Sequence, residues 1–156
     1  MLDEIDLAAA LTGEWRIARS VSGQATMTGM ATFTPAQGGD LHYREHGQMV
    51  LAGGQSYDFI RSYIYRFGAG WMEVLFDEGP PRLFHRVELT RDGASIVGEG
   101  WRNCQPDTYA SRYRFDLPDA FSIAHRVDGP RKSYLIASEF VRPNANVRHD
   151  RHSMQG

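Results

Sequence analysis

Polar and apolar residues alternate along most of this chain, and a period of two is typical of β-strands with one buried face. The alternation is clearest in five segments rich in aromatic and β-branched residues, which favour strands. These segments are SYDFIRSYIYRF (56–67), WMEVLFD (71–77), RLFHRVEL (82–89), DTYASRYRFD (107–116) and KSYLIASEF (132–140). Turn signals built mainly from Gly, Pro and Asp interrupt the chain at nine places, so we expect about ten strands.

The first segment has a different pattern. In LDEIDLAAAL, residues 2–11, the apolar positions and the run of alanines suit a short helix. Many short antiparallel strands in a small protein form a sandwich or a closed barrel, and closure leaves no exposed sheet edge. The sequence therefore predicts an all-β fold, an antiparallel up-and-down barrel of about ten strands preceded by a short helix.

The length of the chain indicates its domain organisation. A chain of 156 residues is long enough for one domain with its own core. We expect residues 1–143 to form a single barrel domain. Residues 144–156 are polar and follow a proline, so we expect a flexible C-terminal tail there.

Charge, cysteine content and motifs exclude several classes of partner. The chain has 17 Lys and Arg against 19 Asp and Glu, a net charge of −2, so no basic footprint indicates nucleic acid. Cys104 is the single cysteine and no apolar run could span a bilayer, which indicates a cytoplasmic protein without membrane contact. Glycine-rich nucleotide motifs and paired zinc-ligand motifs are absent, so no cofactor or metal is expected. The sequence leaves a homo-oligomer open.

The stretch LTGEW, residues 11–15, resembles the G-x-W entry of lipocalins and their relatives. In that superfamily the Trp closes one barrel end, and a basic residue of the last strand packs over its ring. The resemblance implies a lipocalin-like barrel in which Gly13, Trp15 and Arg142 are structural. Arg142 ends the last predicted strand, where it could form a cation–π contact with Trp15.

A second resemblance covers nearly the whole chain. The segments LHYREHG, RSYIYRF, VLFDEGPPRLFH, CQPDTY, VDGPRKSY and FVR resemble a bacterial family of unknown function with a lipocalin-like barrel. This resemblance implies a small ligand-binding β-barrel without an established substrate. The family usually reads H-x-C-x-x-D-x-Y, whereas Arg102 stands at the His position here. A role of that His therefore does not carry over to this chain.

The segment LHYREHG, residues 41–47, places a carboxylate on an apolar face. Leu41, Tyr43 and Glu45 point the same way, and the parity of the next strand turns Arg61 inward among aromatic rings. An isolated buried charge is costly, so we expect Glu45 and Arg61 to pair. We expect this pair to share a hydrogen-bonded cluster with at least one of Tyr109, Tyr113 and His85.

Polar residues on the inward faces form the candidate ligand-binding site. In the ambiguous segment RLFHRVEL we place Leu83, His85 and Val87 inward. The candidate ligand-binding residues are Tyr43, Glu45, Arg61, Tyr63, His85, Asp107, Tyr109, Tyr113 and Tyr134. Hydrogen-bond donors among rings suit a small, largely apolar or aromatic ligand whose polar head, an acid or a carbonyl, is bound at Arg61.

Three alternatives use the same interior. In the first, the polar cluster is a structural ion-pair network without a ligand. In the second, the cavity belongs to an enzyme in which Glu45 or His85 is the acid–base group. Haem binding, as in some ten-stranded relatives of the lipocalins, would use His85 or His125 as the axial ligand.

Overall fold

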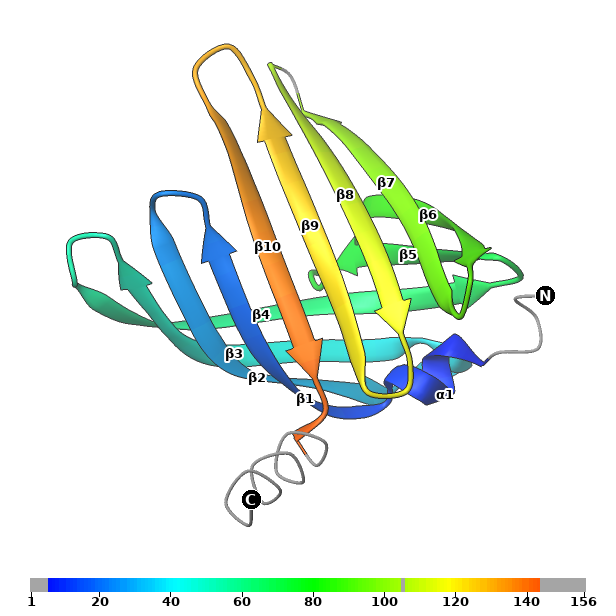
Figure 1. Cartoon of the computed structure of the whole chain (residues 1–156). Helices are drawn as coiled ribbons and strands as arrows, with labels where there is room; N and C mark the ends of the chain where they lie inside the picture. The colour runs from blue at the N-terminus through cyan, green and yellow to red at the C-terminus, as the bar shows by residue number, and fades with distance from the viewer. Residues whose placement is uncertain (1–5, 105, 144–156) are drawn as a thin grey trace.

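Ten antiparallel strands form a closed barrel within the described part of this computed structural model, residues 6–104 and 106–143 (Figure 1). Each strand pairs with its neighbours in sequence, and β1 pairs with β10 to close the sheet. The strands are β1 (Gly13–Val21), β2 (Ala25–Pro35), β3 (Leu41–Leu51), β4 (Ser56–Gly68), β5 (Trp71–Phe76), β6 (Arg82–Asp92), β7 (Ser95–Cys104), β8 (Asp107–Asp116), β9 (Ala120–Asp128) and β10 (Ser133–Val141). A 3₁₀ turn, η2 (Gln37–Gly39), joins β2 to β3. The predicted fold class is confirmed, and the predicted tail of residues 144–156 lies outside the described residues.

Helix α1 (Leu7–Leu11) precedes β1 and lies at one end of the barrel (Figure 1). Asp6 caps this helix, because its carboxylate accepts a hydrogen bond from the backbone N–H of Ala9 at 3.0 Å. The predicted short helix is confirmed and ends at the predicted residue, while residues 1–5 lie outside the described part. Among the described residues, no helix has the length and apolar character needed to cross a bilayer.

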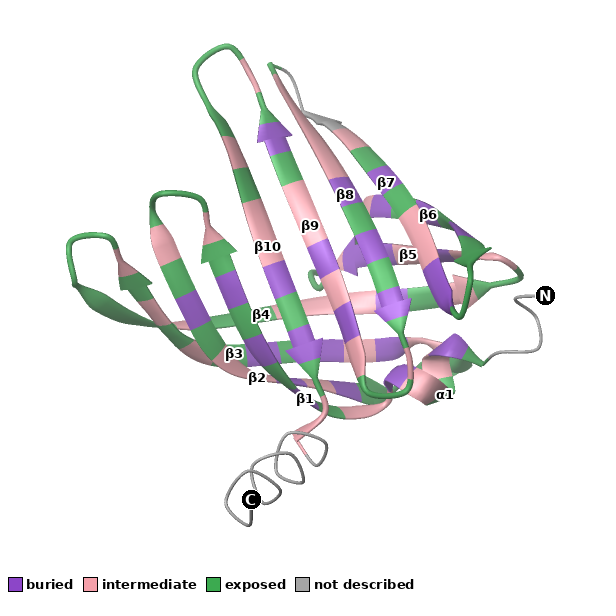
Figure 2. Cartoon of the chain, viewed as in Figure 1, coloured by how far each residue is buried: buried purple, intermediate pink, exposed green. Residues whose placement is uncertain are grey.

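Burial alternates along the strands, and Figure 2 shows it as bands of buried and exposed residues. In β1 the side chains of Trp15, Ile17 and Arg19 are buried, and the residues between them are exposed. The second half of β8 repeats this pattern with Ser111 and Tyr113. One face of a closed sheet points to the interior, so residues that alternate along each strand lie alternately inside and outside the barrel.

Aromatic rings fill the barrel next to α1. Trp15 is fully buried and donates a hydrogen bond through Nε1 to the carbonyl oxygen of Leu11 at 2.8 Å. Its ring meets Phe121 edge-on at 4.7 Å between centroids, and Phe121 stacks on Phe140 at 4.2 Å. This cluster closes the end of the barrel, as predicted for Trp15.

Arg142 joins the end of the last strand to this closed end of the barrel. Its guanidinium lies 3.9 Å from the centre of the Trp15 ring, so the predicted cation–π contact is confirmed. The same guanidinium donates hydrogen bonds to the carbonyl oxygens of Ala10 (2.7 Å), Thr12 (3.0 Å) and Glu14 (3.0 Å). One side chain thus ties β10 to the end of α1 and to the start of β1.

A β-bulge in β6 changes which residues face inward. Val74 of β5 pairs with His85, but the next residue, Leu75, pairs with Leu83, so Phe84 is the additional residue. His85 is buried as predicted, whereas Leu83 is 45% exposed and its predicted inward position is wrong. The bulge turns Phe84 toward the interior, where it lines the cavities described below.

Candidate ligand-binding site

A buried ion pair lies on the inner face of the barrel and joins β1 to β3 over β2. Glu45 faces inward, as predicted, and is 1% exposed. Its partner is Arg19, whose two terminal nitrogens donate to Oε2 at 2.6 Å and to Oε1 at 2.9 Å. The Tyr43 hydroxyl also donates to Glu45, and the Nε of Arg19 donates to the Ser138 hydroxyl at 2.7 Å. The predicted pairing of Glu45 with Arg61 is wrong, although the two residues are opposite each other in the β3–β4 ladder. Arg61 is exposed and not buried as predicted, so its charge does not need a buried partner.

Sequence reasoning missed Arg19, although a signal for it was present. Arg19 has the same parity as Trp15, so the alternation of β1 places both side chains inside. Arg19 must then cross β2 to reach Glu45 on β3. The register pairs Ala31 of β2 with Glu45, and because Ala31 has a small side chain and Gly29 has none, the guanidinium has room to cross.

The ion pair is charged in the folded protein. Burial alone would raise the pKa of Glu45, but the hydrogen bonds and charge of Arg19, with the Tyr43 hydroxyl, reverse this and lower the pKa below its usual value. Burial alone would also lower the pKa of Arg19, and Glu45 raises it instead. Burial, followed by the charge of Glu45, raises the pKa of Tyr43 well above its usual value. The pair is therefore a carboxylate and a guanidinium, and Tyr43 is a neutral donor.

His85 and Tyr113 form a separate buried pair. The Nε2 atom of His85 lies 2.7 Å from the Tyr113 hydroxyl, so the predicted cluster that joins either residue to Glu45 and Arg61 is wrong. Burial, followed by the charges of His125 and Arg102, lowers the pKa of His85 to about 3. The imidazole of His85 is therefore neutral, and its Nε2 is already used in a hydrogen bond.

A cavity of about 350 Å³ lies at the end of β5 and at the starts of β6 and β8, whereas α1 lies beside the start of β5 and the end of β6. The cavity is therefore at the barrel end away from α1. We call it the mouth cavity, and its lining residues are Arg61, Tyr63, Phe76, Arg82, Phe84, Arg102, Tyr109, His125, Val127 and Ile136. Below it lies an inner chamber of about 30 Å³, next to the Arg19–Glu45 pair. Four rings, three guanidinium groups and one imidazole make the mouth cavity suitable for a small molecule that has both apolar and polar parts.

Phe84 is the central ring of the mouth cavity. Its ring centroid lies 4.9 Å from that of Phe76 and 6.1 Å from that of Tyr63, in stacked arrangements. It also contacts His85 at 4.3 Å and stacks near His125 at 5.9 Å. The bulge in β6 therefore places a half-buried ring between the mouth cavity and the inner chamber.

The three arginines of the mouth cavity differ in their partners. Arg82 forms an ion pair with Glu78 at 2.8 Å and lies over the ring of Phe76 at 4.5 Å. Arg102 donates to the carbonyl oxygen of Leu83 at 2.8 Å and lies 5.1 Å from the Phe76 ring centre. No hydrogen bond or ion pair joins the Arg61 guanidinium to another residue in the described ranges. Its donors are free to bind a ligand.

His125 lies at the boundary between the mouth cavity and the inner chamber and lines both. Its Nδ1 lies 2.7 Å from the Ser111 hydroxyl. Burial, followed by the charges of Arg19 and Arg61, lowers the pKa of His125 to about 4, so this imidazole is neutral at pH 7. In the described ranges, no group of three or more His, Cys, Asp or Glu residues is arranged to hold a metal ion.

The structure divides the predicted ligand-binding residues between two levels of the interior. Arg61, Tyr63 and Tyr109 line the mouth cavity. The residues that line the inner chamber are Tyr43, Glu45 and Tyr113, together with Arg61 and Tyr63.

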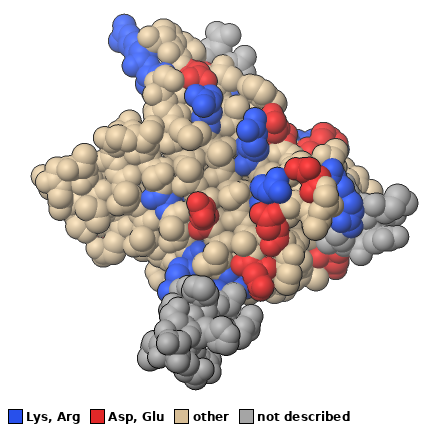
Figure 3. Space-filling model, viewed as in Figure 1, with Lys and Arg blue, Asp and Glu red and all other residues tan. Residues whose placement is uncertain are grey.

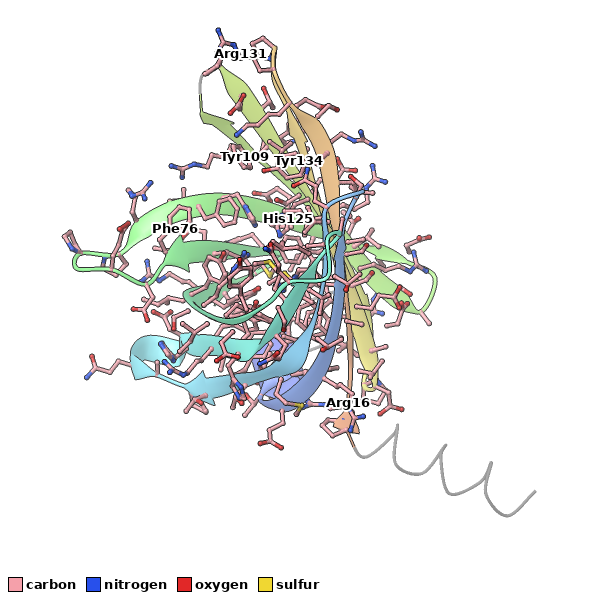
Figure 4. All side chains as sticks on the ribbon, turned by 90° about the vertical axis from the view of Figure 1, so that its left-hand side faces the viewer. Arg16, Phe76, Tyr109, His125, Arg131 and Tyr134 are labelled. Atoms are coloured by element: carbon pink, nitrogen blue, oxygen red, sulfur yellow. The ribbon has the colours of Figure 1, made fainter. Side chains whose placement is uncertain are left out.

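Three predicted residues lie outside both linings. His85 is buried next to Tyr113, and Asp107 forms an ion pair with Lys132 at 3.1 Å. Tyr134 is half-buried and pairs with Val127 of the mouth cavity across the β9–β10 ladder. Figure 4 shows Tyr134 beside Tyr109, with His125 deeper in the barrel.

The ligand-binding prediction omitted several lining residues of the mouth cavity. Phe76 shares the parity of Met72 and Val74, which are buried, so alternation in β5 contained a signal for it. No such signal existed for Phe84, because a bulge reverses the parity that alternation assigns. The other omitted residues are Arg82, Arg102, Val127 and Ile136, together with His125, which the sequence offered only as a haem ligand.

These observations define the class of protein: a closed antiparallel β-barrel with a ring-lined cavity at one end. The chain belongs to DUF6314, a family of unknown function, whose model matches residues 11–142. The expectation of a barrel from a family of unknown function is thereby confirmed. No curated protein matches the sequence significantly.

Solved structures of designed proteins are similar to the chain at low sequence identity. A redesigned β-barrel, mFAP1, bound to DFHBI is 12% identical, and the alignment covers 86% of this chain and 97% of mFAP1 with a TM-score of 0.40. A de novo designed fluorescence-activating β-barrel is 15% identical, and the alignment covers 88% of this chain and 98% of the designed chain with a TM-score of 0.41.

Proposed function

We propose that this protein binds a small, largely aromatic ligand with a polar head group in the mouth cavity. One observation carries the proposal: the cavity of about 350 Å³ is lined by four rings and by a guanidinium, that of Arg61, with no ion-pair partner in the described ranges. Small-molecule sites are concave, mostly apolar and equipped with a few polar groups that fix orientation.

The rings would hold the apolar part of the ligand. Phe84 is half-buried and already takes part in stacked contacts with Phe76 and Tyr63, so a planar ligand would extend an existing stack. Each aromatic pair contributes about 0.5–1.5 kcal/mol beyond the burial of its area. The N–H donors of Arg61 would hold the polar head of the ligand. The guanidinium is planar, so two of its donors can bind two acceptor atoms of one group at the same time.

The geometry gives less support to an enzyme that uses Glu45 or His85. Both oxygens of Glu45 accept hydrogen bonds from Arg19, and Oε1 also accepts one from Tyr43. His85 is bonded to Tyr113 through Nε2, and neither Glu45 nor His85 lines the mouth cavity. The hydrogen bond to Tyr113 also occupies Nε2 of His85, the atom that would otherwise bind haem iron. We therefore propose a binding protein.

We also propose a lipocalin-like kinship for the barrel and a cytoplasmic location. The kinship rests on Gly13, Trp15 and Arg142, which make the contacts that the G-x-W resemblance implies. The location rests on the single Cys104, because proteins of oxidising compartments commonly carry cysteine pairs. Residues 1–143 would act as one barrel unit, with the small molecule as its partner.

Native mass spectrometry of the protein purified from its own host tests the binding function. We expect a bound small molecule that dissociates on denaturation. Ile136→Trp, which adds a ring inside the mouth cavity, should abolish retention while the variant keeps its circular dichroism spectrum. The matched control is Ile60→Trp, which adds the same ring at a position that is 58% exposed and should keep the ligand. A wild-type protein that carries no ligand and binds no aromatic probe would contradict the proposal.

A further inference from the structure

We propose that the ligand of the mouth cavity is an anion, an aromatic carboxylic acid whose carboxylate is bound by Arg61. This inference rests on the proposed function and adds the charge and chemical class of the ligand. It is carried by the charged side chains that line the mouth cavity, all of which are positive.

Charges of a single sign line the mouth cavity. Three guanidinium groups contribute to the lining and no carboxylate does, in a protein whose net charge is −2. Glu78 balances Arg82 at 2.8 Å. Arg61 and Arg102 have no carboxylate within ion-pair distance among the residues that the structure describes. The cavity therefore holds two positive charges that no described residue of its wall neutralises.

The outer surface of the barrel carries charges of both signs. Figure 3 shows acidic and basic side chains interspersed on the visible face of the barrel. Some outward-facing arginines form ion pairs, such as Arg66 with Asp40 at 3.2 Å and Arg112 with Glu99 at 3.4 Å. Others, such as Arg16 and Arg44, are exposed and have no ion-pair partner among the described residues. Three guanidinium groups around one cavity, two of them without a carboxylate partner in the described ranges, point to a negative ligand that completes the balance.

The interior carboxylate is not available to neutralise Arg61. Glu45 lies opposite Arg61 in the ladder, but its two oxygens are occupied by Arg19 and Tyr43. The positive charge of Arg61 still helps to lower the pKa of Glu45, so the two side chains interact through space without a hydrogen bond. Arg19 thus satisfies Glu45 and leaves the donors of Arg61 for a ligand.

The lining also indicates why a carboxylate on an aromatic ring fits. A guanidinium binds a carboxylate with two parallel hydrogen bonds, and such charge-assisted bonds are about twice as strong as neutral ones. Rings such as Phe84 and Tyr63 line the same cavity, so a bound aromatic ligand would cover part of the exposed Arg61 guanidinium from water and strengthen the attraction between opposite charges. The neutral imidazole of His125 adds a polar contact without adding a competing charge.

Isothermal titration of the full chain with three matched probes tests this inference. The probes are 2-naphthoate, its neutral analogue 2-naphthamide and 2-naphthyl phosphate. We expect 2-naphthoate to bind about tenfold or more tightly than 2-naphthamide, as for a hydrogen bond to a charged group. Arg61→Gln should remove this preference, because it should weaken the binding of 2-naphthoate more than the binding of 2-naphthamide, while Arg61→Lys should keep part of the preference.

Arg66→Gln is the control, because it removes the same charge from the same strand but on the outer face, and it should keep the preference. Equal affinity of wild-type protein for the acid and the amide would overturn the anion inference and leave the binding function standing. Tighter binding of the phosphate than of the acid would overturn the choice of a carboxylate. Binding of none of the three probes would overturn both the inference and the proposed function. These comparisons on the wild-type protein hold even if a variant fails to fold.

Discussion

The Nη1 atom of Arg142 lies 3.0 Å from the point that a Cβ atom would occupy at Gly13. The guanidinium passes over this glycine on its way to the Trp15 ring. Gly13 also has a φ of +110°, in the region that side chains disfavour. The glycine of the G-x-W stretch is thus required for two reasons, its backbone conformation and the passage of Arg142.

Substitution of Gly13 by Ala should lower the free energy of unfolding by about 1–3 kcal/mol, because the added methyl group is strained and displaces Arg142. Urea denaturation followed by tryptophan fluorescence measures the change. Gly23→Ala is the control: Gly23 has a φ of +70°, but a Cβ there would meet open space. A loss at Gly13 no larger than the loss at Gly23 would show that contact with Arg142 has no energetic role.

Substitution of Trp15 by Ala should destabilise the barrel by about 3–5 kcal/mol, as for other large-to-small changes in a core. The ring is fully buried, contacts Phe121 and carries Arg142 on one face. Trp101→Ala removes a ring that is 64% exposed and should change the free energy of unfolding by less than about 0.5 kcal/mol. Similar losses from the two variants would contradict the role of Trp15 in closing the barrel.

Substitution of Arg19 alone should lower the free energy of unfolding more than substitution of both residues of its ion pair with Glu45. Arg19→Met leaves the Glu45 carboxylate buried without its cation, which should cost about 3–5 kcal/mol of stability at pH 7. The double variant Arg19→Met with Glu45→Met should recover part of this loss, because no orphan charge remains. Arg66→Met, which breaks an exposed pair with Asp40, should cost less than about 1 kcal/mol. A double variant that is less stable than Arg19→Met alone would contradict this prediction, because it would show that the buried Glu45 side chain stabilises the fold even without Arg19.

Stability should rise with pH from about 4 to about 6.5 because of two buried imidazoles. The folded-state pKa is about 3 for His85 and about 4 for His125, below the ordinary 6.5 of the unfolded chain. Between these values the unfolded chain binds more protons, so lowering the pH favours unfolding by up to about 1.4 kcal/mol per pH unit for each His. Their contribution is complete above pH 6.5 and is lost as the pH falls.

Urea midpoints of the wild type, His85→Gln and the double variant with His125→Gln, measured between pH 5 and pH 7.5, test this dependence. The slope of stability against pH should decrease in that order. The Glu45 carboxylate has a lowered pKa, so its contribution is lost only at lower pH, below the ordinary value of about 4.5. An unchanged slope in both His variants would contradict the burial of neutral imidazoles.

The sequence by itself determined the barrel and several of its inward residues. A period of two needs only local geometry, because successive side chains of any strand point to opposite faces. Alternation therefore predicted the inward positions of Tyr43, Glu45 and Tyr113, and the turn signals predicted the number of strands. The contact of Arg142 with Trp15 was predicted from a family resemblance, which carries tertiary information that alternation lacks.

The tertiary structure alone decided which charges pair and which ring lies at the centre of the mouth cavity. Arg19 and Arg61 both have inward parity, and Arg61 is even the ladder neighbour of Glu45. Arg19 binds Glu45 because the small residues of β2 let its side chain reach over that strand to β3, a contact between three strands that the alternation within one strand does not encode. Phe84 faces inward because one extra residue in β6 shifts the register against β5, and a shift of one residue exchanges the two faces of a strand.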